Sequence, residues 1–248
     1  MIKKILLPLS LTLNVLFIGG LAIAVPKVIS VADGFSAVLS DFMERRMDAI
    51  EASQVDRADI VFLGDSITHE GAWDEYFPGH IAVNRGIGGD TVEQVIERFH
   101  QVAKLTPSQL FVMVGINNLN EGNAVDAIVA QYATLFDRID DSLEGTGVVI
   151  QSVLPTNDEW LFDVSLDDVN ALNSFLSAEA ERRGYRYIDV GTLFADEQGR
   201  LDPAYSNDGI HLSGDAYRLW ADLLRPYVDT VEAVDAIAPT PSQSVPSQ

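Results

Sequence analysis

The stretch Ile60-Val61-Phe62-Leu63-Gly64-Asp65-Ser66 joins an apolar run to a turn, and it decides how the rest of the chain is interpreted. A short apolar run bounded by turn residues is typical of a buried strand in a parallel sheet. Gly, Asp and Ser favour tight turns, so Ser66 would lie just beyond the carboxyl end of that strand. Such a turn is by itself more often structural than catalytic, and we expect Asp65 to order it.

Further apolar runs follow along the chain, separated by segments with helical periodicity. The expected strands are 60–63, 81–84, 110–114, 148–153 and 187–190. The expected helices are 91–104, 124–143, 166–183 and 214–228. Regular alternation of strands and helices indicates an α/β fold, here a three-layer α/β/α sandwich around a central parallel sheet of about five strands.

Two loops beyond these strands carry residues suited to a site. Gly86-Ile87-Gly88-Gly89-Asp90-Thr91 follows the second expected strand, and Gly115-Ile116-Asn117-Asn118 follows the third. The carboxyl ends of parallel strands share one edge of a sheet, where ligand sites form. Asp90-x-x-Glu93 and Thr91-x-x-Gln94 both also fit a capping box at the start of the following helix.

The segment Asp208-Gly209-Ile210-His211, before the last expected helix, completes a possible catalytic set with Ser66. A serine hydroxyl is a weak nucleophile unless an imidazole takes its proton, and a carboxylate must orient that imidazole. Ser66, His211 and Asp208 supply these three groups. Acyl transfer also needs donors for the developing oxyanion, and the Ser66 N–H, the Gly89 N–H and the Asn117 amide would form such a set.

Other kinds of site fit the sequence poorly. A dinucleotide loop needs an acidic residue about twenty positions later, at the end of the next strand, where this chain has Gly115-Ile116-Asn117. The remaining histidines are scattered, there is no cysteine, and the spacing typical of zinc ligands is missing. We therefore expect neither a metal nor a cofactor.

In order and spacing these four segments resemble the signature blocks of the GDSL or SGNH hydrolase family, over roughly residues 60–227. The resemblance implies Ser66 as nucleophile, Gly89 and Asn117 as further oxyanion donors, and Asp208 and His211 as the rest of the triad. Many members read Gly-x-Asn-Asp where this chain has Asn117-Asn118, and the first Asn is the functional one. The motifs are similar to those of platelet-activating-factor acetylhydrolase and carbohydrate acetylesterase members, whose fold is α/β/α and flavodoxin-like.

The expected function is therefore that of a serine esterase acting on short acyl groups of a small-molecule or glycan ester. Trp160 and Phe162 follow the fourth expected strand and would either line the substrate site or simply cover the core. Two alternatives stay open. One is a lysophospholipase or thioesterase for longer acyl chains, and the other is a non-catalytic module of the cell envelope on the same fold.

The first 27 residues predict export. Lys3-Lys4 precedes the apolar segment 5–26, which ends in Ala22-Ile23-Ala24. These are the parts of a secretory signal peptide, although the apolar segment is long enough for an uncleaved membrane anchor. In either case residues 1–27 engage the membrane or the secretion machinery, and the hydrolase domain is periplasmic or secreted.

We expect residues 28–57 to be a helical lead-in, 58–232 the hydrolase domain and 233–248 a disordered tail rich in Pro, Ser and Gln. The net charge of −21 disfavours nucleic acid and polyanionic substrates, because like charges repel. Neutral esters are not disfavoured.

Overall fold

The computed structural model describes residues 27, 34, 37, 38, 40–157 and 164–230. The apolar segment 5–26, the aromatic residues Trp160 and Phe162, and the tail 233–248 lie outside the described residues. The chain divides into a unit up to Ala49 and a larger unit from Ile50 onward. Residues 40–51 are helical, and within the described part of the chain no helix has the length and apolarity that a membrane span requires.

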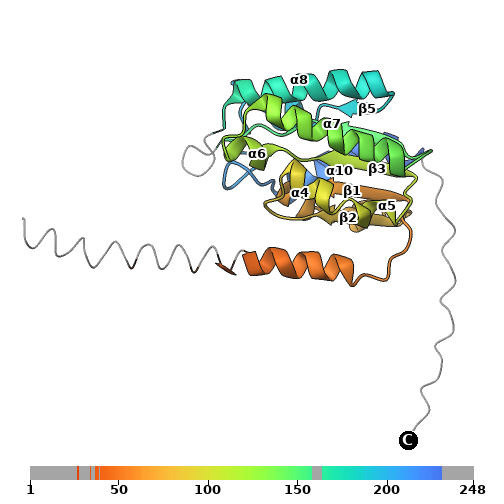
Figure 1. Ribbon diagram of the computed structural model, residues 1–248. Coiled ribbons are helices and arrows are strands. Elements are labelled where there is room, and N and C mark those ends of the chain that lie inside the picture. Colours follow the sequence, from red (N-terminus) through yellow and green to blue (C-terminus); the bar gives the residue numbers. More distant parts are fainter. Residues whose placement is uncertain (1–26, 28–33, 35–36, 39, 158–163, 231–248) are drawn as a thin grey trace, which may run out of the picture. The chain divides into compact units, whose positions relative to one another are not determined.

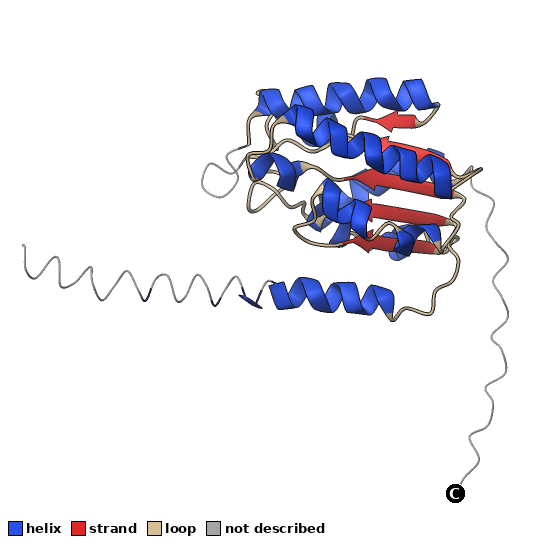
Figure 2. Ribbon diagram, viewed as in Figure 1, coloured by secondary structure: helices blue, strands red, loops and turns tan. Residues whose placement is uncertain are grey.

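A five-stranded sheet with all neighbours parallel forms the centre of the larger unit (Figures 1 and 2). Its strands are β1 (Ile60–Gly64), β2 (Ala82–Gly86), β3 (Gln109–Met113), β4 (Gly147–Gln151) and β5 (Arg186–Ile188). They lie in the order β2-β1-β3-β4-β5. The predicted α/β fold with a parallel five-stranded sheet is confirmed.

The longer helices lie close to their predicted limits. They are α7 (Val125–Ser142), α8 (Leu166–Arg183) and α10 (Gly214–Val228). In Figure 1, α4, α7 and α8 cover one face of the sheet and α10 lies behind it, and α7 contacts both α4 and α8. Four one-turn helices are additional to the prediction: α2 (Ser66–His69), α3 (Trp73–Tyr76), α6 (Ile116–Asn120) and α9 (Gly191–Phe194).

The single helix predicted over 91–104 is wrong, because the chain forms two helices there. They are α4 (Val92–Glu97) and α5 (His100–Ala103). Arg98 ends α4 with backbone angles of φ −98° and ψ 13°, and its side chain turns into the interior. A buried hydrogen-bonded guanidinium at this point outweighs the periodic pattern that favoured one continuous helix.

An aromatic cluster packs α3 and α10 against β1. The Trp73 ring stacks on Phe62 with 4.1 Å between ring centroids and meets Trp220 edge-on at 4.8 Å. The indole of Trp220 also donates a hydrogen bond of 2.8 Å to Gln151 Oε1 at the end of β4. Large buried aromatic rings stabilise such contacts, so α10 is held firmly on its face of the sheet.

Two glycines allow α2 to pack directly onto the strand ends. A Cβ atom on Gly64 would lie 2.1 Å from the Met113 carbonyl oxygen, and one on Gly86 would lie 2.3 Å from the His69 nitrogen. Backbone atoms cannot move aside as a flexible side chain can. Glycine at both positions therefore lets the turn that carries Ser66 lie against the carboxyl edge of the sheet.

Candidate active site

Ser66 is the first residue of α2, immediately after β1. Asp65 caps this helix, with its Oδ1 accepting a hydrogen bond of 3.0 Å from the Ile67 N–H. The Tyr217 hydroxyl of α10 donates to the Ile67 carbonyl at 2.7 Å. The turn is thus held from inside by a buried carboxyl group and from α10 by a buried phenol, which leaves little freedom for the Ser66 backbone.

Ser66, His211 and Asp208 lie in one chain of hydrogen bonds. The distance from His211 Nε2 to Ser66 Oγ is 3.0 Å, and the distance from His211 Nδ1 to Asp208 Oδ2 is 2.7 Å. Ser66 and His211 are separated by 145 positions in the sequence. This geometry allows the imidazole to accept the hydroxyl proton while the carboxylate stabilises the charge that results.

The Asp208 carboxylate is held by more than the imidazole. Its Oδ1 accepts hydrogen bonds from the N–H groups of Ile210 at 3.0 Å and His211 at 2.8 Å. Partial burial alone would raise the pKa of Asp208, but the bonds from the His211 ring and from these two N–H groups outweigh it and lower the pKa to about 2. The group is therefore ionised at neutral pH, as an orienting carboxylate must be.

Gly89 lies in the loop after β2 and Asn117 lies in α6, which follows β3 at the same edge of the sheet. Gly89 has φ +79°, a conformation that side chains other than glycine rarely adopt. Asn117 Nδ2 donates to the Asp90 carbonyl oxygen at 2.9 Å, which fixes its amide beside the loop that carries Gly89. An amide NH₂ has two hydrogens, so one remains for an oxyanion.

A buried ion pair underlies this loop. Arg98 Nε lies 2.5 Å from Asp90 Oδ2, with side-chain exposures of 3% and 6%. The same guanidinium donates to the carbonyl oxygens of Arg85 at 2.8 Å and Gly64 at 3.0 Å. Arg98 thus joins the ends of β1 and β2 to the residue that follows Gly89.

Of the two capping boxes predicted for this loop, the one formed by Thr91 and Gln94 is confirmed and the one formed by Asp90 and Glu93 is wrong. Thr91 and Gln94 form the capping box of α4 in both directions. The Asp90 carboxylate pairs with Arg98 instead. Asn118, next to the predicted oxyanion residue, accepts the Val92 N–H at 2.9 Å and so supports the start of the same helix.

The sequence reasoning missed three residues that organise the site, namely Tyr217, Arg98 and Asn157. Asn157 joins two loops: its N–H donates to the Gly209 carbonyl at 2.7 Å and its amide donates to the Leu201 carbonyl at 3.1 Å. Only Arg98 left a signal, because an arginine interrupts the apolar positions of the segment 92–102. Among the described residues, no cluster of three His, Cys, Asp or Glu side chains is placed to hold a metal ion.

Comparisons with known proteins show the family and the fold of this chain. A family model described as the GDSL-like Lipase/Acylhydrolase family matches residues 62–219. Platelet-activating factor acetylhydrolase IB subunit alpha2 of Gallus gallus is 27% identical over 167 residues, which are 64% of this chain and 71% of that protein.

Two solved structures share the fold. One is a GDSL-like lipase from Bacteroides thetaiotaomicron, with a TM-score of 0.65 and 22% identity, covering 76% of this chain and 97% of that one. The other is a catalytic mutant of Axe2, an acetylxylan esterase from Geobacillus stearothermophilus, with a TM-score of 0.57 and 18% identity, covering 68% and 93%.

Proposed function

The chain belongs to the GDSL-like lipase/acylhydrolase family, and from this membership we propose that it is a serine esterase that releases short acyl groups from carboxylic esters. The observation that carries the proposal is the hydrogen-bond chain from Ser66 Oγ through His211 to Asp208. Each group is within hydrogen-bonding distance of the next, as a nucleophile, its base and the orienting carboxylate require.

In the proposed reaction Ser66 Oγ attacks the ester carbonyl carbon while His211 Nε2 takes the hydroxyl proton. The carbonyl oxygen becomes an oxyanion, which the Ser66 N–H, the Gly89 N–H and the free hydrogen of the Asn117 amide stabilise. The tetrahedral intermediate collapses to an acyl-enzyme, and His211 gives its proton to the leaving alcohol. Water activated by His211 then attacks the acyl-enzyme, which releases the acid and restores Ser66.

The names of two similar proteins support a short acyl group. One is called an acetylhydrolase and the other an acetylxylan esterase. On this basis we propose acetyl as the preferred acyl group and a glycan as the preferred alcohol. Hydrolysis rates across p-nitrophenyl acetate, butyrate, octanoate and laurate test the acyl preference, and a steep rise toward laurate would favour the alternative of a long-chain lipase or thioesterase.

The serine mechanism is tested by labelling the full-length protein with a fluorescent fluorophosphonate. We expect the wild type to be labelled and to hydrolyse p-nitrophenyl acetate, and Ser66→Ala to do neither. Ser142→Ala is the matched control, because Ser142 is exposed at the end of α7, and this variant should behave as the wild type. Labelling that persists in Ser66→Ala would refute Ser66 as the nucleophile.

We also propose that the protein works in the periplasm or outside the cell, supported by the charge and apolarity pattern of residues 3–26. Cell fractionation followed by N-terminal sequencing tests this. A new N-terminus after Ala24 would indicate a cleaved signal peptide, and an intact membrane-bound chain would indicate an anchor. Recovery of the intact chain in the cytoplasmic fraction would contradict both.

A further inference from the structure

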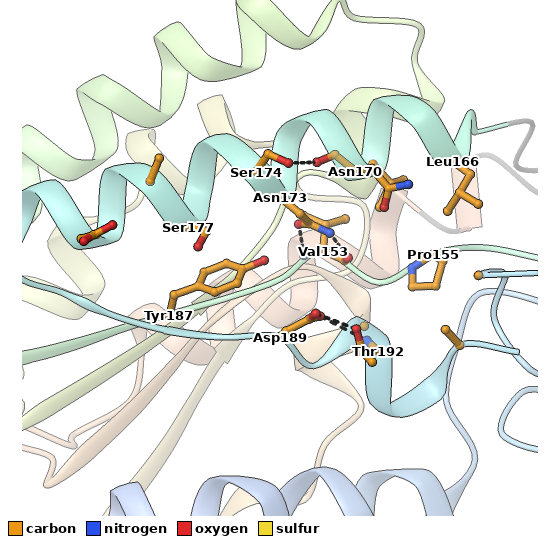
Figure 3. A pocket seen from close by; sticks show the side chains of 16 residues that line it. Val153, Pro155, Leu166, Asn170, Asn173, Ser174, Ser177, Tyr187, Asp189 and Thr192 are labelled. Atoms are coloured by element: carbon orange, nitrogen blue, oxygen red, sulfur yellow. Dashed lines mark hydrogen bonds between the residues drawn. The ribbon is translucent and has the colours of Figure 1, made fainter. Parts of the chain in front are cut away.

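A cavity of about 660 Å³ lies between α8 and the edge of the sheet that β4 and β5 form (Figure 3). One wall is α8, and the opposite wall comes from the ends of β4 and β5 together with α9. This volume falls in the range of about 300–1,000 Å³ in which proteins hold small molecules. None of the triad residues lines it.

The wall formed by α8 is polar and largely open to solvent, since Asn170, Ser174 and Glu181 are exposed and Ser177 is half-buried. Asn170, Ser174, Ser177 and Glu181 follow at spacings of four, three and four residues, so they share one face of the helix. A neighbouring face, which includes Val169, Leu172 and Leu176, is buried against the core. The polar face therefore borders a hollow that the core does not fill.

The opposite wall offers an aromatic ring beside a carboxylate that is already bonded, because Asp189 accepts from the Thr192 hydroxyl at 2.6 Å and from the Ser152 hydroxyl at 3.2 Å. Figure 3 shows Tyr187 extending into the space beneath α8, with Asp189 and Thr192 beside it. Burial raises the pKa of Tyr187 to about 12, and the nearby Asp189 adds to this, so the hydroxyl keeps its proton at neutral pH. An aromatic face with a polar tip can contact both the ring and the hydroxyl groups of a ligand.

Asn173 has a different role, although it also lines the cavity. Its Oδ1 accepts the Val153 N–H at 2.8 Å and its Nδ2 donates to the Val153 carbonyl at 2.9 Å. Both ends of this amide are therefore used to hold α8 against the segment that follows β4. The cavity keeps its shape through this clamp, and Asn173 is excluded from the ligand contacts that we infer.

The charge of the lining selects the class of ligand. Among the sixteen lining residues there is no Lys or Arg, while Glu181 and Asp189 contribute carboxylates. An anion would be repelled. Hydroxyl groups, by contrast, donate to carboxylates and accept from amide or hydroxyl donors, so an uncharged polyhydroxylated molecule matches the lining.

The cavity is connected to the loop that carries the predicted base. Asn157 bonds to the Gly209 carbonyl on one side and to the Leu201 carbonyl on the other. Leu201 pairs with Ala195, which lines the cavity. Asn157 thus ties the wall of the cavity to the loop 206–212 through its backbone N–H and its side-chain amide.

We propose that this cavity binds a sugar unit of a neutral glycan whose ester group lies on another sugar unit of the same molecule. The inference rests on the proposed esterase function and names its substrate class. It assigns Ser177, Glu181 and Tyr187 as binding residues of this cavity, which none of the triad residues lines.

Binding is measured with the full-length Ser66→Ala protein, so that hydrolysis cannot interfere. The probes are the neutral tetrasaccharides of xylose, glucose, mannose and N-acetylglucosamine, and tetragalacturonate serves as the anionic comparison, all followed by isothermal titration calorimetry. We expect at least one neutral tetrasaccharide to bind and tetragalacturonate not to bind. Adding Ser177→Trp, which fills the cavity, should weaken that binding by about tenfold or more.

Ala171→Trp is the matched control, since Ala171 is exposed on α8 and does not line the cavity; binding should be unchanged. If Ser177→Trp fails to fold, the variants Tyr187→Phe and Glu181→Gln test the proposal in its place. Each should weaken binding of the neutral tetrasaccharide by about three- to tenfold, because each loses one hydrogen bond to the ligand.

The proposal is overturned if no neutral tetrasaccharide binds at about 10 mM, if tetragalacturonate binds more tightly, or if the cavity variants bind as Ser66→Ala alone does. Fluorophosphonate labelling of the wild type keeps the two proposals apart. Labelling without glycan binding refutes only the cavity assignment, and glycan binding without labelling refutes only the serine mechanism.

Discussion

Replacement of Arg98 by Met should destabilise the protein more than most surface or loop substitutions. The Arg98 guanidinium pairs with Asp90 at 2.5 Å and donates to the carbonyl oxygens of Arg85 and Gly64. Met has a similar length but none of these donors. The substitution would leave the Asp90 carboxylate buried without its cation and would remove the hydrogen bonds that the Arg85 and Gly64 carbonyl oxygens accept from the guanidinium. The Gly64 carbonyl keeps its bond from the Ile87 N–H.

The expected loss of stability can be summed from these lost interactions. Breaking a buried ion pair by removing one partner costs about 3–5 kcal/mol, because the remaining charge stays desolvated. Each of the two lost hydrogen bonds to a carbonyl oxygen adds about 1 kcal/mol. We therefore expect Arg98→Met to lower the free energy of unfolding by about 5–7 kcal/mol, a large part of the stability of a typical domain.

Urea unfolding at neutral pH measures this loss, with Arg218→Met as control. Arg218 is exposed, and its carboxylate partners Asp215 and Asp222 lie 3.9 and 3.7 Å away, so the control should lose no more than about 1 kcal/mol. The double variant Asp90→Asn with Arg98→Met should be less destabilised than the sum of the single variants, because no unpaired charge remains. A loss below about 1 kcal/mol for Arg98→Met, or strict additivity, would refute this reasoning.

Three further predictions concern residues of the site. Burial raises the pKa of Asp65 from 3.8 to about 7, so between these pH values the folded protein holds a proton that the unfolded chain releases. The free energy of unfolding should therefore fall by up to about 4 kcal/mol between pH 4 and 7. In urea titrations at several pH values, Asp65→Asn should show a smaller dependence of this free energy on pH. An unchanged slope would contradict the assignment. Asp208→Asn should lower kcat for p-nitrophenyl acetate by about 10³–10⁴-fold, because an amide does not stabilise the imidazolium; retention of wild-type kcat would exclude Asp208. In Gly89→Ala the added Cβ would meet no atom within 4 Å, but the alanine would have to adopt φ +79°. The melting temperature of this variant should fall below that of the wild type by an amount equivalent to about 1–2 kcal/mol. An unchanged melting temperature would show that the loop can relax.

The helix limits could be predicted wherever a local signal marks them. Ser213 caps α10 and Ser165 caps α8, and Gly184 ends α8 in the left-handed conformation. Each of these signals lies within a few residues of the helix end that it determines. The predicted ranges 166–183 and 214–228 agree with the structure for that reason.

Features that depend on distant contacts could not be predicted in the same way. The break between α4 and α5 requires partners for Arg98, which are Asp90 in the loop before α4 and the Gly64 carbonyl, 34 residues away at the end of β1. The cavity beside α8 likewise depends on how this helix packs against β4 and β5 in three dimensions. Periodicity reports which face of a helix is apolar but not which distant element will meet it.

A single helix explains how Ser66 and His211 are held together. Tyr217 of α10 bonds to the Ile67 carbonyl in the Ser66 turn. At the start of the same helix the Ser213 N–H donates to the Tyr205 carbonyl at 2.7 Å, which braces the loop carrying His211. Because α10 is also packed on β1 through aromatic rings, any shift of this helix would move the nucleophile turn and the base loop together. The Ser66–His211 distance is then protected by one rigid element, and substitutions such as Tyr217→Phe should act on the position of Ser66 rather than on its chemistry.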